Sequence, residues 1–339
     1  MKSVKLALLA GAACLAMADA QSARAACSPA ATAGNDTINC TGVSGGINTQ
    51  GGDDTLSNSG FLGTFLSPTT RMGAGNDTFN NTAGSALDVR QEGDNDTANV
   101  SGGIVTSLTQ GAGNDIFNST GGLTTSVDQG GDNDTATVSA GSVTTLTQGA
   151  GNDIFNSNGG SAGTVFQNDG NDDANITAGL IGLVLDQGAD NDDVIMSGGF
   201  LTSLIQDTGA DTLQLSGGTA ALVAQGSGDD DATWSGGNML IYGGGDGSDD
   251  LIVTGAAGYN GTQLLAGGDD LSSADGFTDT LTLQGLASSP AIDGTRLVNW
   301  ERVGISGSFV SFSNNALTVG SDAGDGLFIY GLGYVTANN

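Results

Sequence analysis

Apolar and polar positions follow one another in a unit that repeats along most of the chain. Residues 110–119 read QGAGNDIFNS, and the same ten letters return unchanged at residues 148–157. A diverged copy, QGGDNDTATV, begins midway between them at Gln129. The repeat is therefore about 19 residues long, and a fixed period of this kind is typical of proteins that stack one small unit on the next.

An aspartate in a glycine-rich turn marks each repeat, and asparagine usually precedes it. Most intervals are 19 residues, and the long second repeat carries an insertion at residues 61–71, which a surface loop can absorb at little entropic cost. The twelve anchors are Asp36, Asp54, Asp77, Asp96, Asp115, Asp134, Asp153, Asp172, Asp192, Asp211, Asp230 and Asp249.

Apolar residues lie two positions after each anchor and, in most repeats, also four positions after it. This spacing of two predicts a strand with one buried face. Large and small residues also alternate from one repeat to the next, as Phe117 does with Ala98 and Ala136. Stacked layers need such alternation to keep the volume of the core constant, so we expect the repeats to lie in register.

A second strand precedes the turn, with an aliphatic column seven residues ahead of the anchors from Asp96 to Asp230. Two residues later comes a column of glutamines: Gln91, Gln110, Gln129, Gln148, Gln167, Gln187, Gln206 and Gln225. The alternation places these amides inward, where stacked neighbours about 4.8 Å apart can form a hydrogen-bonded ladder. Alternatively, the strand has already turned outward and each glutamine is a solvated turn residue. The sequence leaves both interpretations open.

Two strands and two tight turns in 19 residues predict an all-β fold, a parallel β-solenoid of about 12 rungs. Glycine recurs too often for helices, and no apolar stripe of helical period is present. We expect the regular solenoid to cover residues 26–257. Residues 258–339 predict degenerate solenoid rungs in a more irregular β region.

Residues 1–25 are typical of a secretory signal peptide, with two lysines, an apolar run at 6–17 and small residues before the cleavage point. The apolar run is too short to span a bilayer. Removal of the signal leaves Cys27 and Cys40 in a chain bound for an oxidising compartment. We predict that they form a disulfide, which would stabilise the first turn by roughly 3 kcal/mol.

The charge balance restricts the partners and the chemistry. The chain has 37 acidic residues against seven lysines and arginines, a formal net charge of −30, which excludes nucleic acid and anionic membranes as partners. Histidine is absent, and both lysines lie in the signal. Because the aspartates are spread evenly, we expect no enzyme. The alternative, a glycan-active β-helix enzyme, would need a cleft at the insertion of residues 61–71.

Threonines at 106, 125 and 144 form a column like those of ice-binding solenoids. The alternation of the strand places Thr106, Thr125 and Thr144 inward, and the column breaks at Gly163. The sequence therefore argues against an ice-binding column at these positions.

Stacking places the anchor carboxylates about 5 Å apart, where each pair repels by roughly 0.8 kcal/mol even in water. Calcium would offset this repulsion, because it takes six to eight oxygen ligands. The turn of Gly111, Gly113, Asp115 and Phe117, repeated at Gly149, Gly151, Asp153 and Phe155, resembles the RTX nonapeptide, which implies calcium between the coils of a β-roll. The alternative is that each Asn-Asp pair only satisfies the turn backbone, with its charge in water. The predicted calcium column comprises Asp77, Asp96, Asp115, Asp134, Asp153, Asp172, Asp192, Asp211 and Asp230.

The whole chain resembles the N-terminal passenger of a type V autotransporter from a Gram-negative bacterium. The resemblance rests on the signal, the pair Cys27 and Cys40 before the solenoid, and the segments DTLTL at 279–283 and NWERV at 299–303. It implies a surface-displayed protein with a structural or adhesive role, a ligand on a host or cell surface, and an outer-membrane β-barrel translocator as a partner. A freely secreted RTX-like calcium-binding protein is the alternative.

Overall fold

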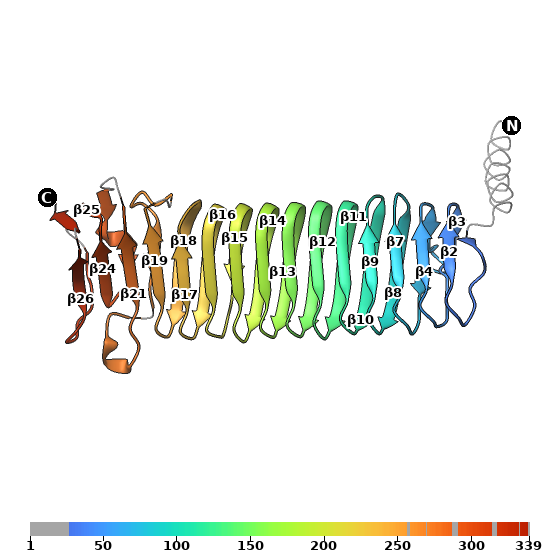
Figure 1. The fold of residues 1–339 in the computed structure, drawn as a ribbon, viewed down its shortest axis with the longest axis horizontal. Helices are drawn as coiled ribbons and strands as arrows, with labels where there is room; N and C mark the ends of the chain where they lie inside the picture. Colours follow the sequence, from blue (N-terminus) through green and yellow to red (C-terminus); the bar gives the residue numbers. More distant parts are fainter. Residues whose placement is uncertain are drawn as a thin grey trace, which may run out of the picture.

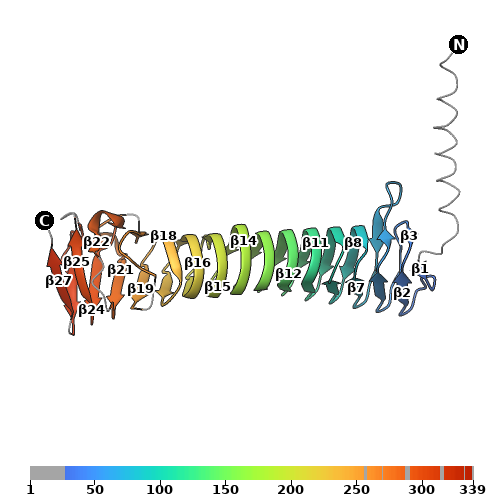
Figure 2. The ribbon, with the colours of Figure 1, turned by 90° about the horizontal axis from the view of Figure 1, so that it is seen from above.

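A computed structural model describes residues 27–255, 258–268, 270–286, 291–313, 317–331 and 333–337. The signal-peptide prediction concerns residues outside these ranges. The chain is 64% strand and 2% helix, and it forms a parallel β-solenoid of about 14 turns with a period near 19 residues. This confirms the predicted fold. Figures 1 and 2 show the turns side by side in a rod, with β2 near one end and β25 near the other.

The first turns contain short strands that alternate between two sides of the rod. They are β1 Cys27–Ser28, β2 Thr37–Cys40, β3 Val43–Ser44, β4 Thr55–Asn58, β5 Phe61–Leu62, β6 Thr69–Arg71, β7 Thr78–Asn81, β8 Ser85–Gly93, β9 Thr97–Val100 and β10 Ile104–Ala112. The structure joins Cys27 and Cys40 by a disulfide, where β1 pairs with β2 in antiparallel fashion.

In the central coils of the solenoid, the β pairing continues around the second of the two tight turns in each repeat. One long strand therefore covers most of a coil. These strands are β11 Ile116–Gly131, β12 Thr135–Ala150, β13 Ile154–Asp169, β14 Asp173–Ala189, β15 Asp193–Ile205 and β16 Thr212–Ser227.

The C-terminal turns return to short strands and include two brief 3-10 helices, η1 Ser273–Asp275 and η2 Gly294–Arg296. The parallel stack passes residue 258 without changing register: Asp250 pairs with Thr280, and Thr280 with Arg302. The strands are β17 Asp231–Trp234, β18 Asn238–Asp246, β19 Asp250–Thr254, β20 Leu264–Ala266, β21 Thr280–Gln284, β22 Ala291–Asp293, β23 Leu297–Val298, β24 Arg302–Ser306, β25 Phe309–Ser313, β26 Gly326–Tyr330 and β27 Tyr334–Ala337.

The core is one continuous column of apolar side chains inside the stack. Phe117 pairs in register with Ala98 on one side and Ala136 on the other, and all three are fully buried. A large side chain thus lies between two small ones, which keeps the packing dense without strain. Within the described residues, no helix is long and apolar enough to cross a membrane.

The glutamine column lies inside the rod and forms a ladder in two runs, from Gln91 to Gln148 and from Gln167 to Gln206. Gln110 donates from Nε2 to Oε1 of Gln91 at 3.3 Å, and Gln129 donates to Gln110 at 3.1 Å. The same Nε2 atoms also donate to backbone carbonyls across the turn, as Gln110 does to Ile116 at 3.2 Å. These side chains are fully buried, so the structure decides for the inward ladder over the solvated turn.

The placement of the threonine column was wrong: Thr106, Thr125 and Thr144 are exposed. The strand bends between Val105 and Leu108, which are both buried although they are three residues apart. Two consecutive residues face outward at this bend, so counting back by two from Leu108 gives the wrong side.

A buried row of carboxylates as candidate metal centre

The anchor aspartates lie in one row on the inner side of the stack. The glycine-rich turns that carry them have the composition of surface turns. Eleven of them are at most 1% exposed, and Asp279 and Glu301, each 3% exposed, continue the row. All nine predicted calcium ligands belong to it. The eleven are Asp54, Asp77, Asp96, Asp115, Asp134, Asp153, Asp172, Asp192, Asp211, Asp230 and Asp249.

One oxygen of each carboxylate bonds to the neighbouring turn. The backbone N–H of Asp96 donates to Oδ1 of Asp115 at 2.7 Å, and that of Asp115 donates to Oδ1 of Asp134 at 2.7 Å. The same bond joins successive anchors from Asp36 to Asp279, at 2.7 to 3.1 Å. At the end, Asp279 N–H donates to Oε2 of Glu301 at 2.7 Å. The row therefore forms a charge-assisted ladder along the rod.

The asparagines that precede the anchors form a second ladder, which runs in the opposite direction. The backbone N–H of Asn114 donates to Oδ1 of Asn95 at 2.7 Å, and that of Asn133 donates to Oδ1 of Asn114 at 2.9 Å. These asparagines are exposed, whereas the aspartates beside them are buried. The Asn-Asp pair does satisfy the turn backbone, but the expectation that its charge faces water was wrong. Consecutive residues of an extended backbone point to opposite sides, so the asparagine points out and the aspartate points in.

The second carboxylate oxygen has no hydrogen-bond partner in the eleven anchors from Asp54 to Asp249. In all eleven fully buried anchors, Oδ2 is inaccessible and makes no hydrogen bond. An ionised carboxylate in this position loses its hydration without full compensation. The row consequently carries a large electrostatic cost when it is charged and bare.

Burial is the largest cause of a raised pKa along the row, and the backbone hydrogen bond at Oδ1 opposes it. Neighbouring aspartates raise most of the values further. The pKa reaches about 8 for Asp96, Asp134, Asp192 and Asp249, about 7 for Asp172 and Asp211, and about 6 for Asp77, Asp115, Asp153 and Asp230.

The row fits a cation in part. A free carboxylate oxygen in each of eleven turns is an atom of the kind that calcium binds, but calcium takes six to eight oxygens. The described part of the chain contains no group of three or more Asp, Glu, His or Cys side chains that could hold a metal ion. Backbone carbonyls and water would therefore have to complete the coordination of any ion held here.

The chain matches no protein-family model and no curated protein. Among solved structures, it is similar to a hyperactive, Ca²⁺-dependent, β-helical antifreeze protein from an Antarctic bacterium. The sequences are 25% identical, the TM-score is 0.52, and the match covers 85% of this chain and 82% of that one. The likeness is consistent with RTX-like repeats. It does not extend to an autotransporter passenger.

Sequence reasoning identified the row but missed that it is buried. The signal was present in the spacing: the buried position Phe117 lies two residues after Asp115, and a spacing of two places both on the same face of a strand. The glycine-rich composition of the turn favoured an exposed aspartate, whereas the spacing of two favoured a buried one. The burial is what gives each carboxylate its unpaired oxygen.

Proposed function

We propose that this protein is an exported structural rod, stabilised by calcium along the carboxylate row and displayed at a cell surface, with an adhesive role. The observation that carries the calcium proposal is the unpaired Oδ2 in each of eleven consecutive turns. The Ca²⁺-dependence stated for the similar antifreeze protein supports it. A ligand that binds only the folded state would raise the stability of the whole stack.

The test of calcium is the melting temperature of the purified mature chain at pH 8, first in chelator, then in millimolar calcium and in magnesium. We expect calcium to raise the melting temperature well above the magnesium value, because a buried site without its own water shell suits calcium better than magnesium. An equal melting temperature in all three solutions would exclude the calcium proposal.

The surface role rests on the rod shape and on the acidic exterior, which keeps such rods soluble and apart. It is tested by expressing the tagged full chain in its own bacterium and treating whole cells with protease. Display predicts loss of the tag from intact cells. A tag found only in the culture medium would favour the freely secreted alternative.

A second candidate function, ice binding, is favoured by a regular uncharged face. On the outer side of β7, β9 and β11, asparagines lie in register and bond to one another: Asn99 donates from Nδ2 to Oδ1 of Asn80 at 2.9 Å, and Asn118 donates to Asn99 at 3.0 Å. Thr78 pairs with Thr97 in the parallel column. These fixed polar columns, and the antifreeze activity named for the similar structure, support this candidate.

Ice recrystallisation inhibition tests it with one variant on each side of the rod. Asn99→Tyr would place a bulky ring in the middle of the asparagine column, and we expect at least a tenfold loss of activity. Ser107→Tyr, on the half-exposed opposite strand, is the matched control and should retain activity. No inhibition by the unmodified chain would remove this candidate, and loss only in the control would place the ice-binding face elsewhere.

A further inference from the structure

The insertion in the second repeat forms a hairpin that carries two apolar side chains away from the rod. Phe65 and Leu66 are its two loop residues, and they are 97% and 92% exposed. The next most exposed large apolar residue of the described chain, Leu183, is 64% exposed. The hairpin is the loop that rises above the blue end of the rod in Figure 2.

The base of the hairpin is fixed. The backbone of Thr64 donates to Ser67 at 2.9 Å, and Ser67 donates back to Thr64 at 3.1 Å. Gly63 has a φ of +85°, and a Cβ there would lie 2.4 Å from the carbonyl oxygen of Pro68. The chain therefore closes tightly below the tip, and the two apolar residues project from this closure into solvent. We call residues 64–67 the apolar finger.

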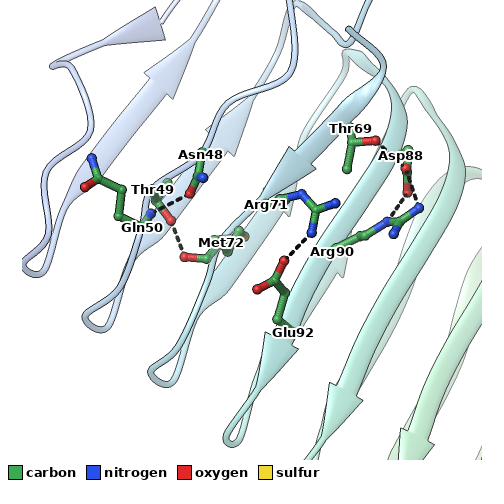
Figure 3. Close-up of polar contacts among 9 residues, drawn as sticks. All are labelled: Asn48, Thr49, Gln50, Thr69, Arg71, Met72, Asp88, Arg90 and Glu92. Carbon is green, nitrogen blue, oxygen red and sulfur yellow. Dashed lines mark hydrogen bonds and ion pairs between the residues drawn. The ribbon is translucent and has the colours of Figure 1, made fainter.

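The root of the apolar finger has a charge composition unlike that of the rest of the rod. Arg71 binds Glu92 at 2.7 Å, and Arg90 binds Asp88 at 3.1 Å (Figure 3). Thr69 donates to Asp88 from the other side at 2.8 Å. Two cations and two anions cancel here, on a chain whose formal net charge is −30. The finger thus stands on an electrically neutral patch.

We propose that the apolar finger inserts Phe65 and Leu66 into the interfacial region of a zwitterionic lipid bilayer. A tip that projects free of its neighbours can enter a lipid surface without a shaped pocket. The neutral root fits headgroups without net charge, whereas the acidic rod is repelled from anionic lipid. Val43 and Phe61 pair across β3 and β5 at the root and are also exposed, which widens the apolar contact.

Flotation of the mature chain with phosphatidylcholine vesicles tests the proposal. We expect the unmodified chain to partition into the vesicle fraction, and the double variant Phe65→Ser with Leu66→Ser to partition at least tenfold less. The matched control is Leu183→Ser, which removes an exposed apolar side chain from the regular part of the rod. It should bind like the unmodified chain. The far-ultraviolet circular dichroism of all three should be the same.

A Leu66→Trp variant locates the tip directly. Trp234 and Trp300 are buried in the core, so lipids brominated near the headgroup should quench only the new tryptophan. Strong quenching, with binding that survives 1 M salt, supports insertion. Failure of the unmodified chain to float, or equal flotation of the double serine variant, overturns it. A finger that binds a protein pocket instead would give this negative result, and neither result depends on calcium binding or ice activity.

Discussion

Replacing one buried aspartate by asparagine should stabilise the protein in the absence of calcium. In Asp134→Asn, Oδ1 still accepts the backbone N–H of Asp115, so the ladder is retained. What changes is the second atom: an uncharged amide nitrogen replaces Oδ2, which is buried and unpaired. The substitution therefore removes a desolvated charge at no cost to the hydrogen bond that positions the turn.

The size of the effect follows from the pKa of Asp134, which burial raises from 3.8 to about 8. At about 1.36 kcal/mol for each pKa unit, the difference between the folded and the unfolded pKa lowers the free energy of unfolding at pH 8 by at most roughly 5 kcal/mol. The new amide donors have no partner in place, which costs roughly 1–3 kcal/mol. We expect a net gain of about 3 kcal/mol at pH 8 in chelator.

The assay is chemical denaturation followed by circular dichroism, at pH 8 and pH 5, with chelator present. The gain should shrink towards pH 5, because the native carboxyl is then protonated and carries no charge. Asp132→Asn is the matched control: it removes an equal charge two residues away, at an exposed position whose φ of 77° asparagine tolerates well. Its gain at pH 8 should be much smaller than that of Asp134→Asn, because the exposed charge of Asp132 is only a minor cause of the raised pKa of Asp134.

A loss of stability in Asp134→Asn at pH 8 in chelator would refute this reasoning, since it would mean that the ionised carboxylate is favourable where it lies. A gain equal to that of Asp132→Asn would show that overall charge, and not burial, sets the effect. In saturating calcium the sign should reverse, because the variant then lacks a ligand that the unmodified chain has.

Other consequences can be measured with the same apparatus. In chelator, the melting temperature of the unmodified chain should fall as pH rises from 5 to 8. Carboxyls whose pKa is raised in the folded state contribute stability that is fully present below their ordinary pKa of 3.8 and is lost as pH rises through their folded pKa values of about 6 to 8. A melting temperature that rises over this range would contradict these pKa values. Gln129→Met should cost roughly 1–3 kcal/mol in denaturation, because Gln110 and Gln148 each lose a buried partner; an unchanged midpoint would mean that the ladder contributes nothing. Deleting residues 115–152 should give a stable, shorter rod, whereas deleting 115–133 should be less stable, because it stacks Ala98 on Ala136 and leaves a cavity; equal melting temperatures would argue against size alternation.

The solenoid could be predicted because each rung repeats the same information. Phe117 alone would suggest a buried position, but its alternation with Ala98 and Ala136 at a fixed period predicts stacking, register and core together. The glutamine ladder was only half predictable. A column of glutamines predicts the register of the stacked strands. Whether the glutamine side chains face the core or the solvent depends on where the strand ends and the turn begins.

The misplaced threonine column has one cause, which is that the alternation of sides along a strand holds only while the strand is straight. At Thr106 a bend puts two consecutive residues outside, and no residue in that stretch marks the bend, because Val105-Thr106-Ser107-Leu108 contains neither glycine nor proline. The apolar finger was located as an insertion, but its form depends on the two backbone bonds between Thr64 and Ser67. Such local closures follow from tertiary contacts and not from the repeat.

The presence of aspartate along the buried row indicates that Oδ2, the second carboxylate oxygen, has a function. Asparagine at the anchor would offer the same Oδ1 acceptor without a charge, and asparagine already serves this purpose in the outer ladder. The outer position also tolerates substitutes, with Asp53, Ala210, Asp229 and Ser248 in four of the turns. The buried position, by contrast, is aspartate in eleven consecutive turns, although that is where charge costs most. The repeat thus keeps a charged residue at the buried position, where charge lowers stability, and varies the residue at the exposed position. A bound cation is the partner that would make the buried charge favourable.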